Sequence, residues 1–461
     1  MGGDTGCRPV AHGAKGEMTM RKTTLAAVSI GWLCSLAGWC AAEDWPGWMG
    51  ARRDSVVRET GLLRSIPEGG LKTLWRVPIA GGYAGPAVAN GRVLVTDYVV
   101  KSGKNTNNSG SRDKIEGTER VLCLEESTGE ELWKHSYDRA YNISYGTGPR
   151  ATPTIDGDRV YTLGAEGDLL CLSLADGQVI WNKQLAETYK TETPIWGHAA
   201  HPLVHGDLLY CLAGGEGSIV VALDKLTGAE QWRALSAGEI GYCAPSVIEV
   251  GGKQQLLIWT PATLNGLDLK TGKVYWSAPL KPSYGMAIAV PRMSGNRLFA
   301  GGIGEVGGMF EIGDDGNSVK ELWRGKAKTA VYPSNAPAYF DGKTIYGADN
   351  GSGQFIAASA ADGTRLWQTY EPTSGGTRRA SHGTAFLVRN EDRYWIFSET
   401  GDLILAELTP EAYREIGRAH VIEPTSDAFG RPVVWTHPAF ANQHAYIRND
   451  KEIICVDLAA P

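Results

Sequence analysis

The chain has 461 residues and a formal net charge of −6, from 45 Lys and Arg against 51 Asp and Glu. Nucleic-acid binding needs a basic footprint, so this charge and the lack of a Lys/Arg-rich block argue against it. The hydrophobic content of 43%, with 15 Trp and 18 Tyr, is sufficient for a folded core and excludes a disordered chain.

The N-terminal region has the three-part order of a secretory signal. Met20-Arg21-Lys22 begins a short basic segment before a mainly apolar run at 25–36, and small residues end at Ala42, before Glu43 and Asp44. We expect cleavage after Ala42, which would make the protein periplasmic or secreted without a membrane span. An uncleaved run would instead anchor it in the membrane. Residues 1–17 lack this pattern, which indicates a start codon placed too early.

One phrase returns five times along the rest of the chain. The phrase begins with a small residue, then a Leu or Ala, then an acidic or small residue. A Gly follows, and four positions after the Gly comes a Trp. The phrase reads CLEESTGEELW at 123–133, CLSLADGQVIW at 171–181, ALDKLTGAEQW at 222–232, GLDLKTGKVYW at 266–276 and AASAADGTRLW at 357–367. The phrases recur with a period in the forties, and a period of this size is typical of stacked supersecondary units.

Each repeat reads as four short strands joined by turns. The Gly supplies the positive φ of the last hairpin, and the Trp fills the wedge between neighbouring units. We count eight units; the fifth has a stretched last turn before Trp323, and the seventh has Ile416 in place of Trp. The tryptophans expected to dock the units are Trp75, Trp133, Trp181, Trp232, Trp276, Trp323 and Trp367.

The two ends of the chain complement each other. The strand around Trp75 precedes the first repeat, whereas the eighth repeat ends before its outer strand. We therefore expect the N-terminal strand to complete the last unit and close a ring. The prediction is an all-β, eight-bladed β-propeller of four-stranded antiparallel blades over 71–461, after a signal peptide at 1–42 and a lead-in at 43–70.

This phrase resembles the tryptophan-docking repeat of the pyrroloquinoline-quinone-like (PQQ-like) propeller family. The opening DWPGWMG at 44–50 also is similar to the start of many exported bacterial members. The family includes quinoprotein alcohol dehydrogenases and a propeller lipoprotein that helps to assemble outer-membrane proteins. The resemblance therefore implies the fold but no single chemistry.

The resemblance does not by itself imply that this chain binds the quinone cofactor. In the dehydrogenases, pyrroloquinoline quinone stacks between a Trp and a disulfide of adjacent Cys residues, with a calcium ion beside it. This chain has no Cys-Cys pair and no CxxCH haem motif. We assign no catalytic residue, no metal and no cofactor, and we keep pyrroloquinoline quinone with calcium as the alternative.

The loops that enter the inner strands are expected to surround one mouth of the central channel. Nearly every entry carries an aromatic residue, and the insert at 101–117 should rise over the same face. The candidate ligand-binding residues are Tyr83, Tyr145, Arg150, Trp196, His198, Tyr242, Tyr284, Arg292, Tyr332, Arg379, His382 and Trp435. Such a mouth suits a flat or extended ligand. The alternative interpretation is that the same rings only plug the channel by packing.

We therefore predict a monomeric, non-catalytic binding module or scaffold for a protein, peptide or saccharide. The alternative is an enzyme on the same fold, either a quinoprotein oxidoreductase or a carbohydrate-active enzyme. His198, His201 and His205 do not satisfy the convergence that a zinc site needs, since His205 falls at the far end of its strand.

Overall fold

The structure is a computed structural model that describes residues 1–2, 43–376 and 378–461. The chain divides into two units, Met1–Trp39 and Cys40–Pro461, and every strand given below belongs to the second. The expected signal peptide at 1–42 lies outside the described residues, apart from Met1 and Gly2. None of the helices in the described ranges is long and apolar enough to cross a membrane.

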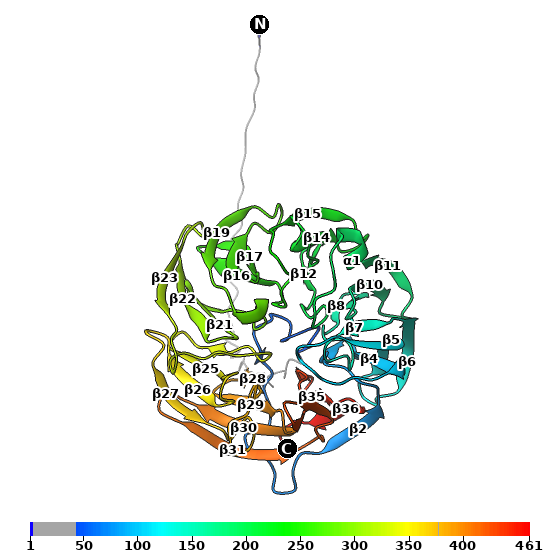
Figure 1. Cartoon of the computed structure of the whole chain (residues 1–461), viewed down its shortest axis with the longest axis vertical. Coiled ribbons are helices and arrows are strands. Elements are labelled where there is room, and N and C mark those ends of the chain that lie inside the picture. Colours follow the sequence, from blue (N-terminus) through cyan, green and yellow to red (C-terminus); the bar gives the residue numbers. More distant parts are fainter. Residues whose placement is uncertain (3–42, 377) are drawn as a thin grey trace, which may run out of the picture. The chain divides into compact units, whose positions relative to one another are not determined.

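In the described part of Cys40–Pro461, eight four-stranded antiparallel blades follow one another around a common axis in chain order (Figure 1). This arrangement confirms the predicted all-β, eight-bladed propeller. Short hairpins connect the strands within a blade, and longer loops lead from each outer strand to the next inner strand. We call the face that carries these entry loops the loop face.

The first four blades have these strands. Blade one contains β3 (Ala87–Ala89), β4 (Arg92–Gly103), β5 (Asp113–Glu125) and β6 (Glu131–Asp138), with β7 (Tyr141–Ile143) paired to β5. Blade two contains β8 (Thr154–Asp156), β9 (Arg159–Leu163), β10 (Asp168–Ser173) and β11 (Val179–Gln184), followed by α1 (Leu185–Tyr189). Blade three contains β12 (Leu203–His205), β13 (Leu208–Leu212), β14 (Val220–Asp224) and β15 (Glu230–Ala234). Blade four contains β16 (Ser246–Val250), β17 (Lys253–Trp259), β18 (Thr263–Leu267) and β19 (Val274–Pro279), followed by the short 3-10 helix η1 (Ser283–Gly285).

The other four blades complete the circle. Blade five contains β20 (Arg292–Ser294), β21 (Arg297–Gly302), β22 (Val306–Ile312) and β23 (Val319–Arg324). Blade six contains β24 (Tyr339–Phe340), β25 (Thr344–Ala348), β26 (Phe355–Ser359) and β27 (Arg365–Thr369). Blade seven contains β28 (Ala385–Asn390), β29 (Arg393–Ser398), β30 (Asp402–Leu408) and β31 (Tyr413–His420), with β1 (Val56–Val57) added inside β28. A separate hairpin of β32 (Ser426–Ala428) and β33 (Arg431–Val433) precedes blade eight, which contains β34 (Ala439–Ala441), β35 (His444–Arg448), β36 (Glu452–Asp457) and β2 (Thr73–Pro78).

The ring closes as predicted, through the N-terminal strand. β2 pairs antiparallel with β36, the last strand of the chain, and Trp75 lies opposite Cys455 (Figure 1). Closure in this way pairs the edge of β36 that would otherwise be exposed.

The repeated Gly and Trp meet across the boundary between blades. The Trp133 indole N–H of blade one donates to the Leu174 carbonyl of blade two over 2.9 Å. Gly177 of blade two, with φ 72°, lies against the same ring, because a Cβ there would come within 2.4 Å of Trp133. The same contact joins Gly129 to Trp75, Gly228 to Trp181, Gly272 to Trp232 and Gly363 to Trp323. The Gly therefore permits the positive φ of its own turn and also leaves room for the Trp ring of the preceding blade.

The junction between blades four and five uses a side chain in place of the usual carbonyl. Trp276 donates to the Gln255 Oε1 atom over 2.8 Å, and Gln255 Nε2 donates to the Gly316 carbonyl of blade five over 2.8 Å. Gln255 is fully buried. Its amide thus links Trp276 to the stretched turn of the fifth repeat.

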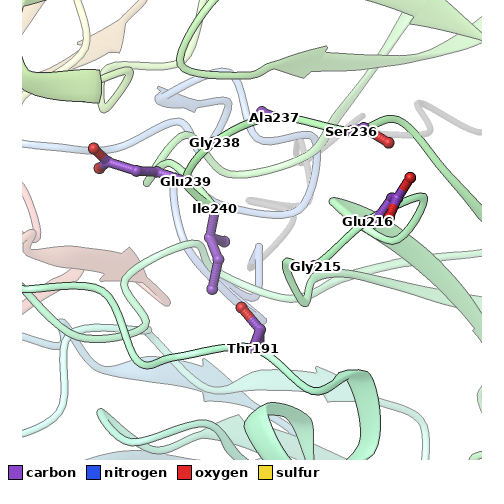
Figure 2. Close-up of a pocket in the computed structure, with 8 residues that line it drawn as sticks. All are labelled: Thr191, Gly215, Glu216, Ser236, Ala237, Gly238, Glu239 and Ile240. Carbon is purple, nitrogen blue, oxygen red and sulfur yellow. The ribbon is translucent and has the colours of Figure 1, made fainter.

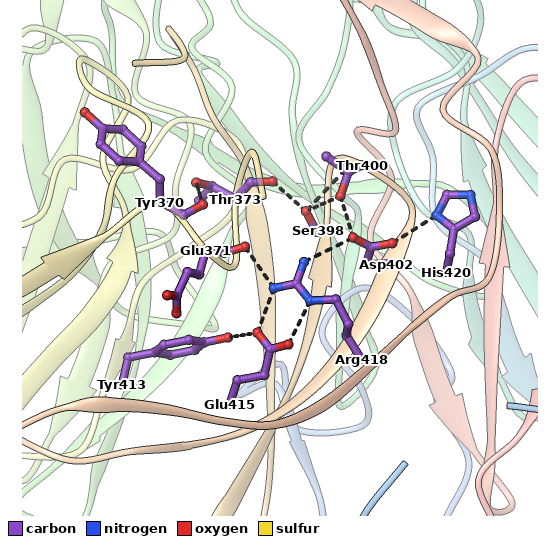
Figure 3. A network of polar contacts seen from close by, with 10 residues as sticks. All are labelled: Tyr370, Glu371, Thr373, Ser398, Thr400, Asp402, Tyr413, Glu415, Arg418 and His420. Atoms are coloured by element: carbon purple, nitrogen blue, oxygen red, sulfur yellow. Dashed lines mark hydrogen bonds and ion pairs between the residues drawn. The ribbon is translucent and has the colours of Figure 1, made fainter. Parts of the chain in front are cut away.

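Blade seven, which has Ile416 instead of Trp, carries a polar network at its loop-face end (Figure 3). Arg418 of β31 pairs with Glu415 over 2.6 Å and with Asp402 of β30 over 3.3 Å, and it donates to the Glu371 carbonyl in the entry loop. The hydrogen bonds from Arg418 lower the pKa of the Glu415 carboxyl. The network ties the outer edge of the blade to the loop that enters it.

Candidate functional site

The lead-in runs inside the ring of blades and not along its rim. Trp45 forms a β-bridge with Val88 on the inner strand of blade one. Further along, the Arg53 guanidinium donates to the carbonyls of His201 and Pro202 in blade three and of Pro245 in blade four. A buried guanidinium loses hydration, and this desolvation lowers the Arg53 pKa to about 9.

The same segment then crosses to the opposite blades. Arg292 of blade five donates to the carbonyls of Arg53 and Asp54, over 3.2 and 2.6 Å. β1 pairs in parallel with β28 of blade seven, so that Val56 lies opposite Arg389. Residues 45–57 thus contact the inner strands of blades one, two, five and seven and the residues just before the inner strands of blades three and four. They fill the axis of the ring beneath the loop face.

Above this filling lies a cavity of about 580 Å³ whose lining comes from the entry loops of all eight blades and from the lead-in. Trp48 of the lead-in stacks on His201, with ring centroids 4.4 Å apart and planes at 12°, and meets the His437 ring edge-on at 5.5 Å. The lining residues with aromatic carbocycles are Trp48, Tyr83, Tyr145, Trp196, Tyr242, Tyr284, Phe386, Phe429 and Trp435. This volume lies within the range of about 300–1,000 Å³ that is usual for ligand pockets.

Eight of the twelve candidate residues line this cavity. They are Tyr83, Tyr145, Arg150, Trp196, Tyr242, Tyr284, His382 and Trp435. The insert at 101–117 reaches it too, since Ser109 and Gly110 line it and the Ser109 carbonyl accepts the Trp196 indole N–H over 3.1 Å. The two ends of the insert, at 101–103 and 113–117, extend the strands β4 and β5, and the residues between them cover part of the loop face.

The other four candidates lie elsewhere. His198 is buried against Gly167, and Arg292 is engaged with the lead-in as described above. Tyr332 is buried, with its hydroxyl donating to the Lys326 carbonyl, and Arg379 is exposed, with its Nε donating to the Gly351 carbonyl. The spacing of the repeats located three of these positions in entry loops and Arg292 at the start of β20, but it did not show which way each side chain points.

Several lining residues were not among the candidates, and Trp48 and Phe429 are the most informative. Phe429 lies at the tip of the β32–β33 hairpin, is 48% exposed, and stacks on His382 at 4.7 Å. Neither residue belongs to the repeat, so the period could not point to them. The two Trp of the DWPGWMG opening were the one available signal for Trp48.

Two hydrogen-bond donors at the cavity have no partner among the described residues. They are the indole N–H of Trp48 and the hydroxyl of Tyr242, on side chains that are 3% and 4% exposed. Buried polar groups are nearly always hydrogen-bonded, so unpaired donors in a cavity wall favour a ligand that brings acceptor oxygens.

The cavity offers little formal charge. Among the described residues that line it there is no Asp or Glu, and the Arg150 guanidinium is already bound to the carbonyls of Gly148 and Ser144 over 2.7 Å each. Burial lowers the pKa of His437 to about 4 and holds that of His201 well below its usual range. The wall is therefore mainly apolar and aromatic near pH 7, and the Arg150 guanidinium is the formal charge among its described residues.

Four of the lining residues have left-handed backbone conformations. Tyr145, Tyr284, His382 and Phe429 have φ between 51° and 58°. Each such position costs of the order of 1–2 kcal/mol for a residue other than glycine, and strained residues cluster at functional sites. All four rings line the cavity, and Tyr284 is 78% exposed.

A second, smaller hollow of about 350 Å³ lies near blade three (Figure 2). Its lining includes Thr191, Ile240 and the carboxylates Glu216 and Glu239, whose side chains point to opposite sides. No group of three or more His, Cys, Asp or Glu in the described residues could hold a metal ion. The hollow therefore lacks the convergence that a metal site requires.

The lining of the large cavity does not fit a pyrroloquinoline quinone with calcium. Calcium needs six to eight oxygen ligands that include carboxylates, and the described lining contributes neither Asp nor Glu. The anionic quinone would need free cations, whereas Arg150 is occupied by main-chain carbonyls. We derive no reaction step through this cofactor.

The fold, the docked tryptophans and the loop-face cavity define a β-propeller of PQQ-like repeats. A family model described as outer membrane protein assembly factor BamB matches residues 117–369 and 312–460, so the chain belongs to this family.

Two proteins that carry the name BamB are similar to this chain. A protein named outer membrane protein assembly factor BamB from Legionella pneumophila (strain Paris) is 28% identical over 189 residues, which cover 39% of this chain and 43% of that protein. The chain thus matches less than half the length of this relative. The crystal structure of BamB from Moraxella catarrhalis superposes with a TM-score of 0.55 at 15% identity, covering 84% of this chain and 97% of that one.

A quinoprotein shares the fold as well. The quinohemoprotein alcohol dehydrogenase from Comamonas testosteroni superposes with a TM-score of 0.56 at 12% identity, over 91% of this chain and 81% of that one. At such identities the likeness shows the fold alone. The fold therefore does not identify what this chain binds, and the residues of the cavity are the relevant evidence.

Proposed function

We propose that this chain is an exported, non-catalytic binding module that takes up a segment of a partner protein in its loop-face cavity. The observation that carries the proposal is a cavity of about 580 Å³ with aromatic walls, no carboxylate among its described lining residues, and two unpaired donors. Membership in a family described as outer membrane protein assembly factor BamB supports a protein ligand in the periplasm.

The cavity suits an extended peptide with an apolar or aromatic side chain. Aromatic rings on the peptide would pack against Trp196 and Trp435, which line the cavity and are only partly buried. The Trp48 N–H and the Tyr242 hydroxyl would donate to peptide carbonyl oxygens. Trp435 is held for this role by its own hydrogen bond to Glu399, over 3.0 Å.

Fluorescence anisotropy with a labelled peptide of alternating aromatic and polar residues tests the proposal. We expect saturable binding that weakens at least tenfold, or about 1.4 kcal/mol, for Trp196→Ala and for Trp435→Ala. Tyr275→Ala, on the outer strand of blade four, is the matched control and should bind normally. Equal binding by the cavity variants and the wild type would contradict the proposal and show that these rings serve only in packing.

The same titration separates the alternatives. Saturable binding of a cello- or chito-oligosaccharide without peptide binding would favour a saccharide module. A bound chromophore and dye reduction after addition of pyrroloquinoline quinone and calcium would favour the quinoprotein alternative and overturn the proposal.

A further inference from the structure

Glu59 is a buried carboxylate at the end of the lead-in, on the side of the ring opposite the loop face. Its side chain accepts three backbone N–H groups: that of Glu43 over 2.7 Å, that of Asn442 over 2.6 Å and that of Gln443 over 2.6 Å. The residue is 2% exposed. Among the described residues, no Lys, Arg or His forms an ion pair with it. A buried carboxylate normally has a cationic partner, because the loss of hydration is otherwise costly.

The turn that faces Glu59 is shaped around this carboxylate. Asn442 and Gln443, between β34 and β35, both have positive φ, 55° and 62°. Two successive residues in this conformation point their N–H groups into one concavity that suits an anion. Blade eight therefore surrounds the Glu59 carboxylate with backbone N–H donors, next to the nitrogen of Glu43.

The charged groups around the Glu43 nitrogen are mostly acidic. The Glu43 side chain accepts the Arg58 backbone N–H over 2.8 Å, and the Arg58 guanidinium lies 3.9 Å from it. Asp44 accepts a backbone N–H at the β3–β4 turn, and Glu126 accepts the side-chain amide of the blade-eight turn. Arg58 also pairs with Asp54. Five carboxylates, counting Glu59 and Asp54, thus share this corner with Arg58, and an added positive charge would stabilise it.

We propose that Glu43 is the first residue of the mature protein and that its α-ammonium group is the cationic partner of the buried Glu59 carboxylate. This inference rests on the expected cleavage after Ala42 and is independent of what binds in the cavity. Cleavage converts the Glu43 N–H, which already donates to Glu59, into an ammonium with the same acceptor. Hydrogen bonds between ionised partners are about twice as strong as neutral ones. Removal of the leader would thereby lock the lead-in, and with it Trp48, into the ring.

The first test uses the full chain, expressed with its own leader and recovered after export. Intact mass and N-terminal sequencing should give Glu43 as the first residue. The α-amine, labelled by reductive ¹³C-methylation, should titrate above the ordinary value of about 8, because Glu59 stabilises its charged form. Glu59→Gln should return the titration toward about 8. Glu68→Gln, the same change at an exposed position in the lead-in, should leave it unchanged.

A second variant keeps the proposal testable if Glu59→Gln folds poorly. One Ala inserted between Ala42 and Glu43 moves the α-amine away from Glu59, with the new cleavage site verified by mass. We expect its midpoint of thermal unfolding to fall and its α-amine to react with an acylating ester at least tenfold faster than in the wild type. The proposal is overturned if the mature chain starts elsewhere, or if the α-amine titrates and reacts alike in all forms. Peptide binding is measured separately, so either proposal can fail without the other.

Discussion

Trp48 lies flat on His201, with their ring centroids 4.4 Å apart and their planes at 12°. One ring belongs to the lead-in and the other to the loop that enters blade three, so the contact joins a segment outside the repeats to the repeat architecture. The floor of the cavity is therefore made by the lead-in. A cavity of this kind depends on the eight blades and on how the N-terminal segment is threaded between them.

The first prediction concerns this floor. Trp48→Ala removes a large ring that is 3% exposed, and we expect the free energy of unfolding to fall by about 3–5 kcal/mol. Trp48→Phe keeps most of the packing and removes the unpaired N–H, so it should weaken peptide binding more than stability. Urea denaturation and peptide anisotropy measure the two effects. An unchanged urea midpoint for Trp48→Ala would contradict the packing described for this ring.

The second prediction compares two glycines of blade two. Gly157→Ala introduces a methyl group at φ 60° with no atom within 4 Å, so we expect a loss of about 1–2 kcal/mol from backbone strain alone. Gly177→Ala has a similar φ of 72°, but its Cβ would lie 2.4 Å from the Trp133 ring. Overpacking should add roughly 1–3 kcal/mol. Thermal unfolding of the two variants measures the difference, and equal midpoints would show that the Gly–Trp contact between blades contributes nothing.

The repeat made the fold predictable, whereas cavity residues outside the repeat were not predicted. Each Gly–Trp phrase is local in sequence, so the number of blades, their strands and the closure by β2 follow from counting. Trp48 and Phe429 lie outside the period, and their position depends on long-range packing that no local pattern encodes.

The sequence also did not predict which way an entry-loop side chain points. Tyr284 has a φ of 57° and lines the cavity, whereas Tyr332, at a similar place in its repeat, turns inward and donates to the Lys326 carbonyl. Sequence spacing located both residues in entry loops. The backbone conformation, which is set by the surrounding loops, decides between cavity wall and core.

The third prediction concerns the side-chain link between blades four and five. Gln255→Leu keeps the approximate volume but leaves the Trp276 N–H and the Gly316 carbonyl without their partner. An unpaired buried group costs about 1–3 kcal/mol, so we expect a loss of this order, measured by urea denaturation. Gln254→Leu, the exposed neighbour, should change stability by no more than about 0.5 kcal/mol. If both variants lose the same stability, the amide does not act as the link.

The last prediction is a loss of stability at mildly acidic pH. Burial lowers the pKa of His437 and of His198 to about 4, and that of His201 falls well below its usual range. Above about pH 6.5 both folded and unfolded chains hold these rings neutral, so their contribution to stability is fully present there. As the pH falls from about 6.5 toward 4, the unfolded chain binds protons that the folded chain does not, and the folded state is progressively disfavoured.

Each of these histidines should therefore contribute a slope of up to about 1.4 kcal/mol per pH unit in this window. Urea denaturation between pH 7 and pH 4.5 measures the slope. His437→Gln retains a donor toward the Asn335 carbonyl, which His437 Nε2 contacts over 3.2 Å, and removes one titrating group. We expect the variant to show a shallower loss than the wild type. Parallel pH profiles would mean that His437 protonates as readily in the fold as in the unfolded chain, and that the floor of the cavity is wetter than its packing indicates.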